Sequence, residues 1–244
     1  MRIQFSKFAL SAILGFALTF TFSCSGGGDE DNDSVGGSSF PDLPKQAYLD
    51  GRSEYKGNGD ITLRIYGDDS YESKPAGKIQ NGQVSLNLPN IENKYLLNWV
   101  KNSLCRMENN AGYECNILYP ENLTGFTTKG LSVTISNKSC TLVPVLTKSG
   151  DYYSNSKVWL DYFSQSGKIT GTSCYSGGSS GSSSSGGDIV TSFDCDAYDN
   201  YDYNFSKGWN IRYGYPVNAN SEDRNITADL SKTGSKLQWW IECE

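Results

Sequence analysis

Alternation of apolar and polar residues is the feature that most constrains the fold of this 244-residue chain. The segment 61–66, ITLRIY, alternates between the two kinds of side chain, and so does the segment 84–88, VSLNL. A period of two places every second side chain on the same face of an extended strand, so both segments are predicted to be half-buried strands. Asn81-Gly82 lies just before the second segment and predicts a tight hairpin turn.

The same pattern continues through the rest of the chain. Further strands are predicted at 131–135, 141–146, 158–163, 168–172, 198–205, 210–215, 226–230 and 236–241. The segment 91–102 differs, because Ile91, Tyr95 and Trp99 are spaced four residues apart. That spacing predicts one short helix with a buried apolar stripe. Together these elements predict a mainly β fold, either an antiparallel sandwich or an open barrel.

The segment 176–187 consists entirely of Ser and Gly, and it admits two interpretations. It either links two domains or forms a long hairpin loop within one domain. The second interpretation is favoured, because residues 188–244 alone would form a small and marginally stable core. We therefore predict a single β domain over 46–244, with a Ser/Gly-rich loop at 176–187.

The first 23 residues are typical of a bacterial export signal. They contain Arg2 and Lys7 and then an apolar run over 8–22, which is shorter than the about 20 residues of a membrane-spanning helix. Ser23-Cys24 follows and resembles the lipobox of bacterial lipoproteins, although Thr21 and Phe22 depart from its usual form. Cleavage would then leave Cys24 at the new N-terminus, carrying diacylglycerol and palmitate. An ordinary signal peptide or an uncleaved anchor is the alternative.

Residues 24–45 are predicted to form a flexible tether. They are rich in Gly, Ser and Asp, contain Pro41 and Pro44, and offer almost nothing to bury. An acidic stretch after the cysteine resembles that of lipoproteins exported to the cell surface. The predicted location is therefore the outer membrane with the domain exposed at the cell surface, and the alternative is a domain that faces the periplasm.

Charge limits the class of partner. Without residues 1–23 the chain holds 19 basic and 27 acidic residues, a net charge of −8. Nucleic acids and anionic lipid surfaces bind clustered Lys and Arg, so neither is an expected partner. The expected partners are the membrane, through the lipid on Cys24, and a polysaccharide or another component of the envelope.

Six cysteines remain after Cys24, and an even number in an exported chain predicts disulfides. Zinc is the alternative, but the chain has neither a CxxC pair nor a histidine. Spacing and elimination predict these pairs: Cys105 with Cys115, Cys174 with Cys195, and Cys140 with Cys243.

The absence of histidine from the whole sequence excludes several kinds of catalysis. Ser-His-Asp and Cys-His nucleophiles, histidine general bases and histidine-bound metals all need this residue. A glycoside hydrolase that uses two carboxylates does not need it. Asp161 and Asp202, on two predicted strands, would be the acids of such an enzyme.

Three tryptophans are candidates for stacking against a sugar ring. Trp209 lies in a Lys-Gly-Trp-Asn turn, where a buried tryptophan that anchors the next strand is the favoured interpretation and stacking is the alternative. Trp239 and Trp240 are adjacent in a predicted strand, so one is expected in the core and the other outside.

The segment 194–204 is rich in Asp and Asn, which are ligands that calcium prefers. Alternation explains the segment otherwise, because it places Tyr201 and Tyr203 in the core and the polar residues between them in water. We therefore predict no metal site and no cofactor.

Several segments resemble a group of uncharacterised bacterial lipoproteins whose C-terminal β domain contains a Lys-Gly-Trp-Asn turn. The matching segments are GKIQNGQVSLNLP at 77–89, VWLDYF at 158–163, GKITGT at 167–172, KGWN at 207–210 and KLQWW at 236–240. The Ser/Gly insert and the six cysteines depart from the usual pattern of the group. The resemblance implies a secreted β domain on a lipid tether, and it implies no activity and no site residues.

The sequence therefore favours a lipid-anchored lipoprotein of the envelope or cell surface that is not an enzyme. A binding role, toward a glycan or in adhesion, and a structural role both fit. The alternative from another class is a carboxylate-based, secreted glycan hydrolase.

Overall fold

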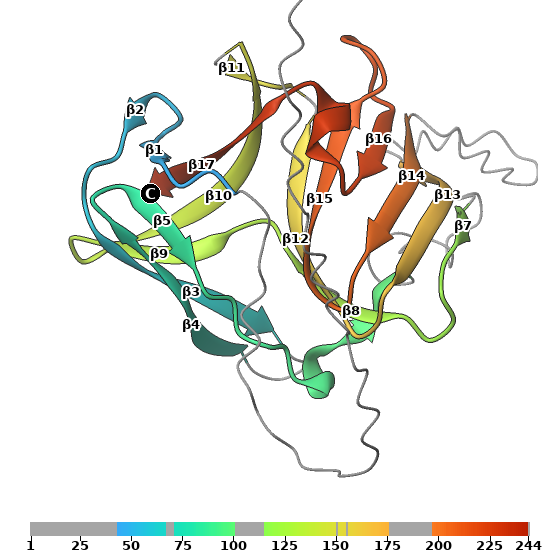
Figure 1. Cartoon of the computed structure of the whole chain (residues 1–244), viewed down its shortest axis with the longest axis horizontal. Helices are drawn as coiled ribbons and strands as arrows, with labels where there is room; N and C mark the ends of the chain where they lie inside the picture. The colour runs from blue at the N-terminus through green and yellow to red at the C-terminus, as the bar shows by residue number, and fades with distance from the viewer. Residues whose placement is uncertain are drawn as a thin grey trace, which may run out of the picture. The chain divides into compact units, whose positions relative to one another are not determined.

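The computed structural model describes residues 43–66, 71–100, 115–149, 151–154, 156–175 and 197–243 (Figure 1). The predicted signal peptide, Cys24, most of the tether and the Ser/Gly-rich loop lie outside these residues. The described part is mainly β, as predicted, and consists of two curled sheets that we name sheet A and sheet B.

Sheet A contains eight strands along its main path, with β11 (Asp151–Tyr152) paired to one of them. Their spatial order is β2 (Ser53–Glu54), β1 (Ala47–Leu49), β17 (Lys236–Cys243), β10 (Lys138–Lys148), β9 (Leu131–Ile135), β3 (Gly59–Tyr66), β4 (Tyr71–Gln80) and β5 (Gln83–Leu86). Neighbouring strands are antiparallel except β1 and β17, the blue and red strands that run side by side in Figure 1.

The two ends of sheet A meet. Gln46 forms a bridge with Gln83, and the Ala47 amide donates a hydrogen bond of 2.9 Å to the carbonyl of Gly82. The Val84 amide donates a second one, of 2.6 Å, to the carbonyl of Lys45. These bonds join the segment around β1 to β5, so the sheet curls back on itself.

Sheet B contains the other eight strands. Their spatial order is β6 (Leu97–Asn98), β8 (Thr124–Thr128), β12 (Lys157–Phe163), β15 (Gly208–Pro216), β16 (Arg224–Thr227), β14 (Ala197–Phe205), β13 (Gly167–Tyr175) and β7 (Cys115–Leu118). Only β14 and β16 are parallel among these neighbours. Two 3₁₀ helices are described, η1 (Asn93–Tyr95) and η3 (Leu230–Thr233).

Each strand predicted from the sequence is present, and the segment 131–135 forms β9 with the predicted bounds. The segment 226–230 is shorter as a strand, because β16 ends at Thr227 and η3 begins at Leu230. The ten-residue β4 was predicted only at its end, through the hairpin turn at Asn81-Gly82. The other strands that were not predicted have two to five residues and little alternation: β1, β2, β6, β7, β8 and β11.

The predicted helix over 91–102 is wrong for residues 91–98, which hold only the short η1 and β6, with non-helical residues before and between them. The residues after position 100 lie outside the described part. Ile91 and Tyr95 are buried in the core of sheet A, whereas Trp99 is buried in the core of sheet B. The segment therefore crosses from one core to the other, and the spacing of its apolar residues reflects that path.

The two sheets share a core. Leu160, Tyr162 and Trp209 of sheet B belong to the same apolar cluster as Leu142 and Trp239 of sheet A. The alternate residues of β12 face a second cluster, which includes Trp99 and Phe163. Sheet B is therefore buried on both faces at β12, which explains why the VWLDYF segment is almost wholly apolar.

A disulfide joins Cys140 of β10 to Cys243 of β17, which are register partners with Cα atoms 4.2 Å apart. This predicted pairing is confirmed. Cys115 and Cys174 are also disulfide-bonded, but Cys105 and Cys195 lie outside the described residues. The pairings proposed for those four cysteines stay predictions.

Candidate functional site

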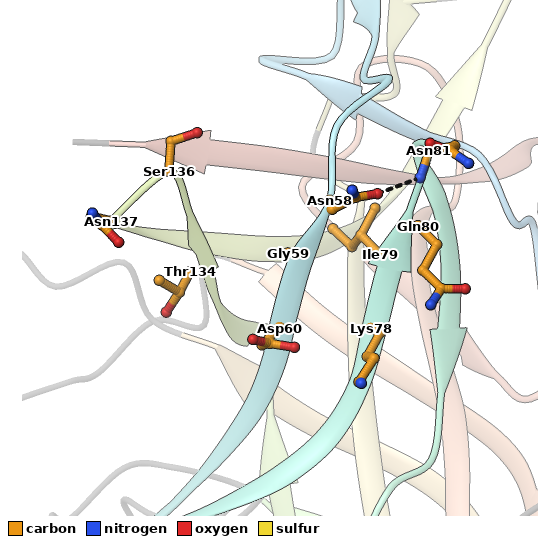
Figure 2. Close-up of a pocket in the computed structure, with 10 residues that line it drawn as sticks. All are labelled: Asn58, Gly59, Asp60, Lys78, Ile79, Gln80, Asn81, Thr134, Ser136 and Asn137. Carbon is orange, nitrogen blue, oxygen red and sulfur yellow. Dashed lines mark hydrogen bonds between the residues drawn. The ribbon is translucent and has the colours of Figure 1, made fainter.

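A polar groove of about 610 Å³ lies at one end of sheet A (Figure 2). It is bounded by the start of β3, the turn between β4 and β5 and the turn between β9 and β10. Ten residues line it: Asn58, Gly59, Asp60, Lys78, Ile79, Gln80, Asn81, Thr134, Ser136 and Asn137. All of these except Gly59 and Ile79 carry a polar or charged side chain.

The groove lies where the pairing of β3 with β9 ends. Register pairs between β3 and β9 begin only at Asp60 with Thr134, whereas β3 already pairs with β4 at Gly59 with Ile79. Gly59 lies at this end and close to β9, because a Cβ atom there would approach the carbonyl oxygen of Thr134 and a methyl group of Val133 at 3.0 Å.

Two tight turns form the walls. Asn81 and Gly82 have φ angles of +50° and +78°, and Ser136 and Asn137 have φ angles of +47° and +64°. Positive φ at both central residues is typical of the two-residue turns that match the twist of a hairpin. The Asn81-Gly82 hairpin predicted from the sequence is thereby confirmed, whereas the Ser136-Asn137 turn was not predicted.

The charged residues of the groove face outward from the sheet. Asp60 is the register partner of both Lys78 and Thr134, and its neighbour Ile61 is buried in the core on the other face. Among the described residues, neither Asp60 nor Lys78 forms an ion pair within 4.0 Å. Asp60 and Lys78 therefore carry one carboxylate and one ammonium group on neighbouring strands, at outward positions of the same face (Figure 2).

Hydrogen bonds hold one wall of the groove in place. The side-chain oxygen of Asn58 accepts a hydrogen bond of 2.8 Å from the Asn81 amide, the dashed line in Figure 2. The Tyr55 hydroxyl donates another, of 2.9 Å, to the carbonyl of Asn58. The wall is thus tied to the β4–β5 turn before any ligand arrives.

The groove can bind a ligand that both donates and accepts hydrogen bonds. Carboxylates only accept and ammonium groups only donate, while amide and hydroxyl side chains do both. Asp60 and Lys78 cancel in charge, so the lining favours neither anions nor cations. A hydroxyl-rich, uncharged molecule matches this set of groups.

The stacking prediction is wrong for Trp209 and Trp239. Trp239 is fully buried inside sheet A. Trp209 is buried between the sheets, where its ring meets those of Phe126 and Tyr162 edge to face. Its indole N–H donates a hydrogen bond of 2.8 Å to the carbonyl of Pro89. Neither ring presents a face to solvent, because alternation turns both toward the shared core.

Trp240 lies on the outer face of sheet A, so the prediction that Trp239 and Trp240 occupy opposite faces is confirmed. Its ring rests against Gly51, where a Cβ atom would lie 2.5 Å from Cζ2 of the indole. The ring of exposed Tyr152 is centred 5.9 Å away. Stacking of a ligand on Trp240 stays a prediction.

The two carboxylates considered for hydrolysis do not face one substrate. Asp161 is fully buried on the inner face of sheet B, whereas Asp202 is exposed on β14 and pairs with Lys168 and Lys232, each at 3.0 Å. Hydrogen bonds from these lysines, Lys232 first, lower the pKa of Asp202. A carboxylate-pair mechanism needs both groups to flank a single glycosidic bond.

Asp161 instead belongs to a buried network that the sequence analysis missed. It accepts hydrogen bonds from Arg212 at 2.7 and 3.3 Å, from the Tyr203 hydroxyl at 3.3 Å and from the Thr127 hydroxyl. Burial alone would lower the pKa of Arg212, but the adjacent Asp161 raises it. The signal in the sequence was an acid inside a strand that is apolar on both faces.

The Arg212 guanidinium also lies between two indole rings. Its central carbon is 5.0 Å from the ring centre of Trp99 and 4.1 Å from that of Trp159. A second buried pair joins Arg224 to Asp199 through two hydrogen bonds of 2.7 and 2.8 Å. These groups satisfy one another, so we assign them to the architecture of sheet B and not to a binding site.

No protein-family model, curated protein or solved structure matches the chain. The resemblance to uncharacterised lipoproteins therefore stays a prediction. Within the described ranges, no group of three or more Asp, Glu, Cys or His side chains is arranged to hold a metal ion. These same residues form no helix that is long and apolar enough to cross a membrane.

The β14 part of the acid-rich segment follows the predicted alternation. Tyr201 and Tyr203 are buried, and Asp202 between them is exposed. Asp194 and Asp196, which the calcium interpretation would also use, lie outside the described residues.

Proposed function

We propose that this protein is a lipid-anchored lipoprotein of the bacterial envelope that binds a polysaccharide at the cell surface without chemical change. The polar groove of sheet A is its binding site. The observation that supports the proposal most is that Asp60 and Lys78 are register partners in a groove whose other polar side chains are amides and hydroxyls.

The charge of the groove favours a sugar over other polar ligands. A phosphate or a sulfate would meet the carboxylate of Asp60, and a cation would meet the ammonium group of Lys78. A sugar presents neighbouring hydroxyls that donate to the first group and accept from the second. The acidic balance of the whole chain argues against nucleic acid in the same way.

The same groove argues for binding and against hydrolysis. Asp60 is the one carboxylate among the described residues that line it. A glycoside hydrolase uses two carboxyl groups, one as acid and one as nucleophile or base. Asp161 and Asp202 do not supply the second, since both lie on sheet B and Asp161 is buried in its ion pair with Arg212.

The proposed site can be tested on the chain from residue 25, which lacks the lipidated cysteine. We expect this protein to bind neutral polysaccharides on a glycan array, and we expect Asp60→Asn to weaken binding roughly tenfold to hundredfold, as for loss of a hydrogen bond to a charged group. Glu54→Gln, at an exposed acid on β2, is the matched control and should bind normally.

Two outcomes would contradict the proposal. Binding that survives Asp60→Asn but is lost in Trp240→Ala would move the site to the outer face of β17. Release of reducing sugar from a bound polysaccharide would replace binding by hydrolysis.

The proposed anchor has its own test. The mature protein should carry the mass of diacylglycerol and fatty acid on Cys24, and Cys24→Ala should leave the membrane fraction. Protease added to intact cells should cleave the protein if it faces outward. Protection from protease until the outer membrane is permeabilised would place it on the periplasmic face.

A further inference from the structure

Two exposed tyrosines lie at the far end of the hairpin that forms the groove. Tyr66 of β3 and Tyr71 of β4 are register partners, are 63% and 68% exposed, and have ring centres 6.2 Å apart. Large aromatic side chains usually bury much of their surface when they fold. Here two of them stand together in solvent with their planes tilted by 39°.

The tyrosine pair lies on the same face of the hairpin as the groove. Along β3, side chains alternate between the buried core residues Ile61, Leu63 and Ile65 and the outward positions between them. The outward positions run without interruption from the groove to the tyrosine: Asp60, Thr62, Arg64 and Tyr66. Their cross-strand partners on β4 are Lys78, Pro75, Ser73 and Tyr71.

A bulge in β4 sets this arrangement. The register shifts between Ile61 and Thr62, so that Ile61 pairs with Gly77 but Thr62 pairs with Pro75. Ala76 is the extra residue, and it is fully buried. If the register of Ile61 with Gly77 continued without the bulge, Tyr66 would lie opposite Glu72, and the two tyrosines would not be partners.

We propose that the groove is one end of a binding track along the outer face of β3 and β4, which ends at Tyr66 and Tyr71. Its ligand is an extended, uncharged polysaccharide chain and not a single sugar. This inference rests on the proposed function of the groove. The seven residues from Asp60 to Tyr66 span about 20 Å at the rise of a β-strand, which is longer than one sugar ring.

The chemistry of the track suits such a chain. The groove end offers hydrogen bonds from Asp60 and Lys78, and the far end offers two aromatic faces for the apolar faces of sugar rings. Arg64 and Thr62 add donors between them. The track holds the two bases Lys78 and Arg64 and the acid Asp60 among uncharged outward residues, so a polyanion gains no continuous row of positive charge.

A length series tests the track with defined probes. Cello-, manno-, malto- and xylo-oligosaccharides of two and of six units are titrated calorimetrically into the chain from residue 25. We expect the best six-unit probe to bind about tenfold more tightly than its two-unit form. Tyr66→Ala with Tyr71→Ala should remove that gain, whereas Asp60→Asn should weaken the binding of both lengths.

Tyr198→Ala, at an exposed tyrosine of sheet B, is the matched control and should keep the full gain. Equal affinity for two and six units, or a gain that survives the double tyrosine variant, would overturn the track and leave the groove as the site. Tighter binding of a hyaluronan hexasaccharide than of any neutral probe would overturn the inferred ligand class. Binding of no glycan at any length would overturn the proposed function itself.

Discussion

The buried faces of sheet A and sheet B are packed with different kinds of side chain. Sheet A curls around aliphatic residues such as Ile61, Leu63 and Leu142, with Trp239 among them. Sheet B encloses two arginine–aspartate pairs, at Asp161 and Asp199, within a wall of aromatic rings.

The difference indicates which interactions fix the structure of each sheet. An aliphatic core tolerates rearrangement as long as its volume is kept. A buried ion pair does not tolerate a displacement of one partner, because each charge removed from water depends on the other at a fixed distance and angle. Sheet A is instead constrained covalently by Cys140–Cys243 and by the meeting of its edges at Gln46 and Gln83.

Breaking a buried pair should have the largest effect. Asp161→Ala leaves Arg212 charged and unpaired between two indole rings, and we expect it to lower the free energy of unfolding by about 3–5 kcal/mol in urea denaturation. Arg212→Met combined with Asp161→Leu removes both charges and should recover most of that loss. A cost below about 1 kcal/mol for the single variant would show that water reaches this face.

Removing the disulfide should affect sheet A more than sheet B. Cys140→Ala with Cys243→Ala releases a link between residues 103 positions apart, and we expect a loss of about 2–4 kcal/mol. Hydrogen exchange should show the added opening in β10 and β17. Equal loss of protection in β12 and β15 would mean that the two sheets unfold as one unit.

Two tryptophans of the shared core provide a matched comparison. Trp209 donates its indole N–H to Pro89, whereas the indole N–H of buried Trp239 has no partner among the described residues. Trp209→Phe should therefore cost about 1 kcal/mol more than Trp239→Phe in thermal or urea unfolding, because only the first loses a hydrogen bond. The reverse order would mean that ring volume decides both.

The smallest effect is expected at an exposed ion pair. Hydrogen bonds from Lys74 and then Lys94 lower the pKa of Glu92 from 4.5 to about 2. Because the folded pKa is the lower one, this contribution is complete above pH 4.5 and is lost as the pH falls toward 2. Glu92→Gln should flatten the fall of the melting temperature in that range, and an unchanged slope would assign the fall to other carboxylates.

The sequence predicted most strands because their alternation is local. In β14, for example, Tyr201, Tyr203 and Phe205 face the core, as their spacing indicates. The same reasoning wrongly predicted a helix from Ile91 to Trp99, because the apolar residues of this segment enter two different cores at a spacing that resembles that of a helix.

The candidate site was hidden for a different reason. Its residues come from three segments, 58–60, 78–81 and 134–137, and each alone is an ordinary turn or strand end. Only the register of β3 with β4 and β9 brings Asp60, Lys78 and Thr134 together. A single sequence carries no direct record of that register, whereas the outward position of Trp240 followed from its neighbours alone.

The parallel pairing of β1 with β17 has a consequence for folding order. Ala47 to Leu49 align with Trp239 to Ile241, so strands almost 200 positions apart must meet before sheet A can close. Contacts between residues so distant in sequence form slowly, because closing the long loop between them has a large entropy cost. The Gln46–Gln83 seam should therefore be among the last parts to form, and the residues just before β1 stay unanchored until it does.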